Sequence, residues 1–244
     1  MKATASTSQT VSDPVSRYAR LGLWALPIFV LLLNVGNITH QPSPRTRFGD
    51  WSLYVTTTEF LLSHLFATIG GQVFAVFGAM ALGVVFMQRG SVRLGLWGLL
   101  TGVTGNVLFA AAQAGIAAFV QPAIGRFYLA GHHDLAKALF DDIGANNTAA
   151  TVVPILGVAL IVTSFVIFGV AVARSADLPK IAGIGLATSM VLFMVLLLAF
   201  DNWLASVAVA LLLVFSVWVV VALNRSEGLP VTPARPSVAG AVGR

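Results

Sequence analysis

The sequence predicts an all-α fold: a six-helix transmembrane bundle with an N-in/C-in topology and a short amphipathic helix at its outer surface. Two observations support this prediction. Of the 244 residues, 57% are hydrophobic and only 9% are charged, whereas a soluble domain has about 25% charged residues. The apolar residues also fall into six runs, and each run has roughly the 20 residues that a helix needs to cross a bilayer.

The first predicted span covers residues 19–38 and follows a tail, residues 1–18, that we expect to be disordered. Lys2, Arg17 and Arg20 form a basic segment at its start. The apolar run is long and no small-residue cleavage site follows it, so a retained span is favoured over a signal peptide. Pro27 is expected to kink this helix, because proline removes a backbone donor and crowds the preceding turn.

The second predicted helix covers residues 57–87. The segment Thr56-Thr57-Thr58-Glu59 has the T-x-x-E form of a capping box, with Thr56 as the cap. A helix of this length extends about 46 Å at 1.5 Å per residue, and a hydrocarbon core is about 30 Å thick. Its first turns, with Glu59 and His64, are therefore expected at or beyond the outer interface.

The four remaining spans are predicted at residues 94–120, 149–173, 181–200 and 204–223. Asn147-Thr148 is expected to cap the fourth span, and Asp201-Asn202-Trp203 to form a tight turn between the last two, which then make an antiparallel hairpin. The proline-containing tail, residues 224–244, is expected to be disordered. Residues 19–223 thus form one transmembrane domain between two cytoplasmic tails.

The third span has a stripe of glycines on one helix face. The stripe consists of Gly95, Gly98, Gly102 and Gly105, at spacings of 3, 4 and 3 residues. Small residues at this spacing let a second helix backbone approach closely. The stripe is expected to pack within the bundle, and a contact between two protomers of a homo-oligomer is the alternative.

Basic residues predict the orientation. The termini and the loops on their side contain ten of them: Lys2, Arg17, Arg20, Arg89, Arg93, Arg174, Lys180, Arg225, Arg235 and Arg244. The opposite loops contain four: Arg45, Arg47, Arg126 and Lys137. Because basic residues mark the cytoplasmic side, both termini are expected inside the cell. Six of the nine acids and all four histidines, His40 among them, then fall on the outer side or at the outer interface.

The second long outer segment, residues 121–148, contains the expected amphipathic helix. Asp134 is a suitable cap and Gly144 a suitable stop. The apolar face between them consists of Leu135, Ala138, Leu139 and Ile143. A short helix with this pattern is typical of one that lies on a membrane surface.

The outer segments hold the residues that could bind a divalent metal. These candidates are His64, His132, His133, Glu59, Asp141 and Asp142. Imidazole and carboxylate ligands suit zinc, and an open coordination position would activate water for hydrolysis. Their spacing matches no established zinc motif, however, and lipid drives ionisable residues into aqueous loops in any membrane protein. No cofactor is therefore predicted, and a metal stays an alternative.

The spans themselves contain neutral polar residues but no ionisable residue near their centres. This pattern disfavours a proton pump, a voltage sensor and a retinal protein. The neutral residues are Asn34, Asn37, Gln72, Asn106 and Gln113. They could line a small cavity, or they could form interhelical hydrogen bonds worth about 0.6–2 kcal/mol each.

Composition also limits the chemistry and the partners. The chain has no cysteine, which excludes disulfides, thiolate catalysis and cysteine-ligated metals. Its net charge is +5, but the basic residues flank the spans as orientation signals do. The expected partner is therefore the lipid bilayer and not a nucleic acid.

One short segment shows a resemblance. Residues 169–183, GVAVARSADLPKIAG, end one span in Arg-Ser, turn through Leu-Pro and begin the next span. This pattern is similar to that of uncharacterised small bacterial multi-span membrane proteins. The resemblance implies a setting in a bacterial inner membrane, and it implies no activity and no functional residue.

Three functions are compatible with these patterns. The sequence favours a non-enzymatic membrane protein with an accessory, structural or sensing role. The alternatives are a small-solute transporter or channel with a neutral polar pathway, and a membrane hydrolase with an outward-facing metal site.

Overall fold

The computed structural model describes residues 14–38, 42–199 and 202–226. These residues form helices and short connections without any strand, and six helices are long and apolar enough to cross a membrane. The predicted all-helical fold and the six spans are thereby confirmed. The two tails at residues 1–13 and 227–244, together with His40 and Asp201, lie outside the described residues.

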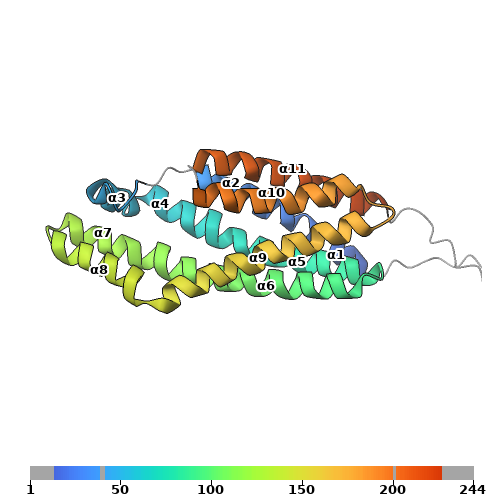
Figure 1. Ribbon diagram of the computed structural model, residues 1–244, viewed down its shortest axis with the longest axis horizontal. Coiled ribbons are helices and arrows are strands. Elements are labelled where there is room, and N and C mark those ends of the chain that lie inside the picture. The colour runs from blue at the N-terminus through green and yellow to red at the C-terminus, as the bar shows by residue number, and fades with distance from the viewer. Residues whose placement is uncertain (1–13, 39–41, 200–201, 227–244) are drawn as a thin grey trace, which may run out of the picture.

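Six helices, one from each span, run roughly along the long axis of the molecule (Figure 1), and their contacts close into a ring. They are α2 (Ala25–Ile38), α5 (Gly70–Gln88), α6 (Val92–Gln113), α9 (Thr148–Arg174), α10 (Lys180–Ala199) and α11 (Asn202–Ser226). Each packs against the helix before it and the helix after it in this order, and α11 returns to pack against α2. The ring encloses a single apolar core.

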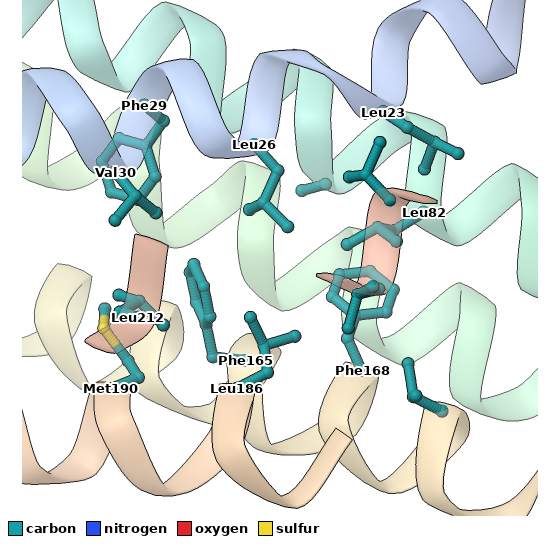
Figure 2. Packing of buried hydrophobic residues seen from close by; sticks show 14 of the residues in the cluster. Leu23, Leu26, Phe29, Val30, Leu82, Phe165, Phe168, Leu186, Met190 and Leu212 are labelled. Atoms are coloured by element: carbon teal, nitrogen blue, oxygen red, sulfur yellow. The ribbon is translucent and has the colours of Figure 1, made fainter. Parts of the chain in front are cut away.

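Figure 2 shows this core from close by. Leu26 and Phe29 of α2 point toward Phe165 of α9 and Leu186 of α10, and all four are almost fully buried. The rings of Phe29 and Phe165 are 6.3 Å apart. The same cluster includes Leu82 of α5 and Leu212 of α11, so buried side chains from five helices of the ring meet in the core.

The first span is broken as its proline predicts. It consists of α1 (Pro14–Leu23) and α2, and Trp24 interrupts the helix three residues before Pro27. A proline ring crowds the carbonyl four residues earlier, which here belongs to Leu23. α1 begins at Pro14, so the last residues of the predicted disordered tail, 14–18, are helical.

The second span confirms the predicted helix but not its cap. α4 (Thr58–Leu62), the π-helical segment η1 (Ser63–Ile69) and α5 form one helix of 31 residues. Its N-cap is Thr57, whose hydroxyl accepts a hydrogen bond from the Phe60 amide at 3.2 Å. Thr56 was the wrong choice, because it ends an additional helix, α3 (Phe48–Val55), and donates to the Leu53 carbonyl at 2.8 Å.

The third span is longer than predicted. α6, a second π-helical segment η2 (Ala114–Val120) and α7 (Gln121–Leu129) form one helix of 38 residues. α8 (His133–Asn146) then folds back against α7. Figure 1 shows this hairpin extending along the long axis of the molecule, with α3 beside it. The expected loop at residues 121–132 is therefore mostly helix.

α8 differs from the predicted surface helix in its ends, its direction and its apolar face. It begins at His133 and ends at Asn146, where Asp134 and Gly144 were expected. It is the antiparallel partner of α7, and its packed side chains are Ala136, Phe140 and Ile143. Leu135, Ala138 and Leu139 of the predicted face are exposed. α8 therefore packs on α3 and α7 through one face, and the predicted contact of its other, exposed apolar face with a membrane surface stays a prediction.

The remaining spans follow the prediction closely. The Asn147 side chain accepts a hydrogen bond from the Ala150 amide at 3.0 Å, which confirms the cap of α9. α10 and α11 form the expected hairpin. α11 continues to Ser226, so the first residues of the predicted C-terminal tail are helical.

The glycine stripe of the third span is buried inside the chain. The Gly98 carbonyl accepts a hydrogen bond from Ser164 Oγ of α9 at 2.7 Å. A Cβ at Gly98 would lie 2.6 Å from the Phe168 ring, and a Cβ at Gly102 would lie 2.6 Å from Ser164 Oγ. Gly95 and Gly105 meet α5 and α9 in the same way. The stripe thus serves packing within the bundle, and this face is not available to a second protomer.

Candidate functional site

The structure separates the candidate metal ligands. Glu59 is exposed in the first turn of α4. His132 and His133 are also exposed. The centroids of their rings lie 6.3 Å from that of Phe127 and 4.3 Å from that of Tyr128, respectively. Among the described residues, no group of three or more histidine, aspartate or glutamate side chains is close enough to hold a metal ion.

His64 has neighbours that explain its place without a metal. Its ring lies 4.0 Å from the ring of Phe60, centroid to centroid. Its Nδ1 is 2.9 Å from the Phe60 carbonyl oxygen and 3.1 Å from Ser63 Oγ. These contacts occupy the ring nitrogen that faces the helix.

Asp141 lies at a polar hollow of about 580 Å³ between α3 and the α7–α8 hairpin. Two basic side chains, Arg45 and Lys137, line the same hollow. Because the positive charges outnumber the negative one, a cation is disfavoured there. None of the other metal candidates lines this hollow.

A different feature, in the bundle, is a partly open cavity of about 160 Å³. It lies between α2, α6, α9, α10 and the helix formed by η1 and α5. The apolar lining residues are Phe29, Leu33, Phe109, Val158, Ile161, Met190, Phe193, Met194 and Leu197. The polar ones are Asn37, Thr68 and Gln72, with the backbone of Gly36 beside them.

One wall of the cavity is formed by α10. Met190, Phe193, Met194 and Leu197 recur at spacings of 3, 1 and 3 residues, which places them on one face of the helix. Two of these four side chains are methionines, which adapt readily to irregular shapes. This wall is therefore apolar and deformable.

The polar residues lie on α2 and on the second span. Thr68 and Gln72 are four residues apart and share a helix face. A Cβ at Gly36 would lie 3.3 Å from Thr68 Oγ1, so the glycine allows α2 to approach η1 closely. Asn37 Nδ2 donates a hydrogen bond to Ser206 Oγ of α11 at 3.0 Å. The cavity therefore joins neutral polar groups to an apolar wall.

Gln72 is the most unusual of these residues. Its side chain is 3% exposed, and its Oε1 has no hydrogen-bond partner among the described residues. A buried carbonyl without a partner costs about 1–3 kcal/mol. The oxygen itself has almost no accessible surface, so Gln72 lines the cavity through other atoms of its side chain.

The sequence had identified part of this site. Asn37 and Gln72 line the cavity, whereas Asn34 and Gln113 do not. Asn106 lines a separate void of about 10 Å³, which shares no lining residue with the larger cavity. Sequence reasoning missed the α10 wall, because apolar residues at helical spacing also occur on lipid-facing surfaces.

Comparison of the chain with protein-family models, with curated proteins and with solved structures gives no match. The functional assignment therefore depends on the geometry of the chain itself.

Proposed function

We propose that the chain is a non-enzymatic, multi-pass membrane protein that binds a small uncharged molecule inside its bundle. The cavity of about 160 Å³ is the observation on which the proposal depends. An apolar cavity of about 150 Å³ in a protein core is large enough to bind benzene or xenon. A molecule with a body of that size is the occupant that this space fits.

The residues that line the cavity suit the binding of a ligand and not the catalysis of a reaction. The lining residues provide two amides and one hydroxyl but no ionisable side chain. General acid–base catalysis needs a group that exchanges a proton near the working pH. A sensing or accessory role, in which the occupied and empty bundles differ in stability, fits such a lining.

Binding is proposed in preference to conduction through the membrane. The void beside Asn106 and Ser164 is about 10 Å³, which is roughly the space of one water molecule. A polar pathway would need this void and the larger cavity to join, and they share no lining residue.

We further propose that the protein lies in a bacterial inner membrane with both ends in the cytoplasm. The ten basic residues on the side of the termini, against four on the opposite side, support this orientation. The α7–α8 hairpin and α3 then project outward from the membrane.

The binding proposal is tested by fluorine NMR with para-fluorotoluene, titrated into lipid nanodiscs that contain the protein. We expect saturable broadening that empty nanodiscs do not produce. Val158→Phe fills the cavity and should abolish it, whereas Val207→Phe, at a lipid-facing position that is 46% exposed, should not. Broadening that never saturates, or that is the same in both variants, would contradict the proposal.

A further inference from the structure

We infer that a hollow at the end of α11 binds the phosphate group of an anionic phospholipid, and that Arg225 is the residue that contacts this phosphate. The α11 hollow has a volume of about 310 Å³ and lies between α11 and the turn that joins α9 to α10. Its lining residues are Asp177, Trp218, Val221, Ala222, Arg225 and Ser226. The hollow shares no lining residue with the cavity described above, so the inference is independent of the proposed ligand of that cavity.

The charges around the α11 hollow favour an anion. Arg89 pairs with Asp177, so these two charges offset each other. Arg225 is exposed, and its side chain has no ion pair or hydrogen bond with another residue in the described part of the chain. One net positive charge therefore remains at the hollow. A guanidinium is a planar group of donors whose geometry matches that of phosphate oxygens.

Arg89 connects the two walls of the hollow to each other. Besides its pair with Asp177 in the turn, it donates a hydrogen bond to Ser226 Oγ at the end of α11 at 3.0 Å. The Arg89 side chain is only 17% exposed. A site whose walls are already connected loses less conformational freedom when a ligand binds.

The α11 hollow continues into an apolar stripe along the same helix. The stripe consists of Val207, Leu211, Val214 and Trp218, which are 41–59% exposed and spaced 4, 3 and 4 residues apart. This spacing places them on one face of α11, and Arg225, seven residues after Trp218, lies on the same face. An acyl chain that follows the stripe would bring its headgroup to Arg225. The stripe therefore favours a phospholipid over a soluble phosphate.

Trp218 marks the membrane interface between the stripe and Arg225. Tryptophan is enriched where the hydrocarbon meets the headgroups, and Arg225 lies about 10 Å further along the helix axis. The Trp218 ring stacks on the Phe215 ring at 6.3 Å, centroid to centroid. Phe215 packs in turn on Gly185 of α10, where an added Cβ would lie 2.3 Å from the Phe215 ring. The indole is thus supported by α10 and can contact the glycerol region of a lipid.

The neighbouring charges favour an anionic headgroup over a zwitterionic one. Arg174 and Lys180 flank the turn that contains Asp177, and both are exposed. The ammonium group of phosphatidylethanolamine would be repelled by these positive charges. Phosphatidylglycerol has the same phosphate without an ammonium group. Basic pockets between membrane helices are known to bind anionic headgroups.

Native mass spectrometry of the full chain in detergent tests the inference. Phosphatidylglycerol and phosphatidylethanolamine with identical acyl chains are titrated separately, so that the apolar contribution is the same for both. We expect phosphatidylglycerol to bind about fivefold more tightly, because a basic residue near the membrane surface contributes about 1 kcal/mol to the attraction of an anionic lipid.

Variants assign this preference to Arg225. Arg225→Gln should reduce the fivefold preference to about onefold while phosphatidylethanolamine binds as before, and Arg225→Lys, which keeps the charge, should retain most of it. Arg93→Gln is the matched control. It removes one exposed positive charge at the same end of the bundle, but Arg93 does not line the hollow, so the preference should be unchanged.

Three outcomes would overturn the inference. An equal loss of preference in Arg225→Gln and Arg93→Gln would show that the lipid is attracted by diffuse surface charge and not by a site. Equal binding of the two lipids, or tighter binding of phosphatidylethanolamine, would contradict the anionic headgroup. Displacement of the lipid by an equal concentration of glycerophosphoglycerol, the same headgroup without acyl chains, would indicate a site for a soluble phosphodiester.

Discussion

Buried amides in the bundle have two different roles at the scale of single residues. Asn37 ties α2 to α11 through its hydrogen bond to Ser206 at 3.0 Å. Gln72, in contrast, lines the cavity and has a buried oxygen without a hydrogen-bond partner among the described residues. Both residues look alike in the sequence, as neutral polar residues within an apolar span, and only their neighbours in the fold distinguish them.

This difference predicts opposite effects of removing the two amides. Asn37→Leu should lower the unfolding temperature in detergent, because an interhelical hydrogen bond in a membrane protein is worth about 0.6–1.7 kcal/mol. Gln72→Leu should leave it unchanged or raise it, because the substitution removes an unsatisfied buried carbonyl. A loss of stability in Gln72→Leu as large as in Asn37→Leu would mean that Gln72 is a structural residue.

The glycines of α6 predict a second effect. Gly98→Ala should destabilise the bundle by about 1–3 kcal/mol, the usual cost of overpacking, because its Cβ would lie 2.6 Å from the Phe168 ring. Gly115→Ala is the matched control, since no atom lies within 4 Å of its added Cβ. Thermal unfolding of the two purified variants measures both effects, and equal stability would contradict the packing described here.

At the scale of helices, α8 depends on an aromatic cluster and not on lipid. The Phe140 ring lies 5.1 Å from Trp51 and 5.7 Å from Phe48, centroid to centroid. Ala136 beside it is fully buried. These contacts connect α8 to α3, although the two helices are about 80 residues apart in the sequence.

Removing this contact should release α8 while the bundle stays folded. Phe140→Ala should cost the α3–α7–α8 unit about 3 kcal/mol, at the lower end of values for buried phenylalanine. Hydrogen exchange in α8 should then accelerate, with little change in α9. Leu139→Ala, one residue away and 36% exposed, is the control and should behave like the unmodified protein. Unchanged exchange in Phe140→Ala would show that α8 is held by other contacts.

The sequence predicts the spans well because the bilayer fixes their length and polarity. The predicted ends of the second span, from α4 to α5, and of α10 agree with the structure to within one residue. Helical structure beyond the apolar runs was predicted less well. α3, the extension of the third span to Leu129 and the packed face of α8 all depend on contacts between segments distant in sequence, and residue periodicity does not encode these contacts.

The candidate site was likewise predicted only in part from the sequence. Asn37 and Gln72 stand out in the sequence because they are polar residues in apolar runs. The apolar wall of α10 resembles any lipid-facing surface, since hydropathy does not distinguish a side chain that lines a cavity from one that faces lipid. The metal candidates stood out equally well, yet the fold places them apart.

At the scale of the whole molecule, polar contacts connect helices of the ring near both ends of the bundle. Arg89, after α5, pairs with Asp177 in the turn between α9 and α10. The same side chain donates to Ser226 Oγ at the end of α11 at 3.0 Å. Asn37 and Ser206 join α2 and α11 toward the other end. These contacts connect helices that are distant in the sequence.

The proposed orientation predicts a labelling pattern in intact cells. The chain has no cysteine, so a single introduced cysteine gives an unambiguous signal. Ala138→Cys on α8 should react with a membrane-impermeant maleimide added from outside. Gln88→Cys at the end of α5 should react only after the membrane is permeabilised. External labelling at Gln88 with protection at Ala138 would reverse the topology.

The most direct measurement of the central claim is photolabelling of the cavity in nanodiscs. The probe is a phenyl diazirine close in size to toluene, and mass spectrometry locates the label. We predict that label concentrates on the cavity-lining segments around Gln72 and Met190, and that excess toluene suppresses it. Label spread evenly over the lipid-facing helix surfaces, and not suppressed by toluene, would contradict the claim that this bundle binds a small molecule.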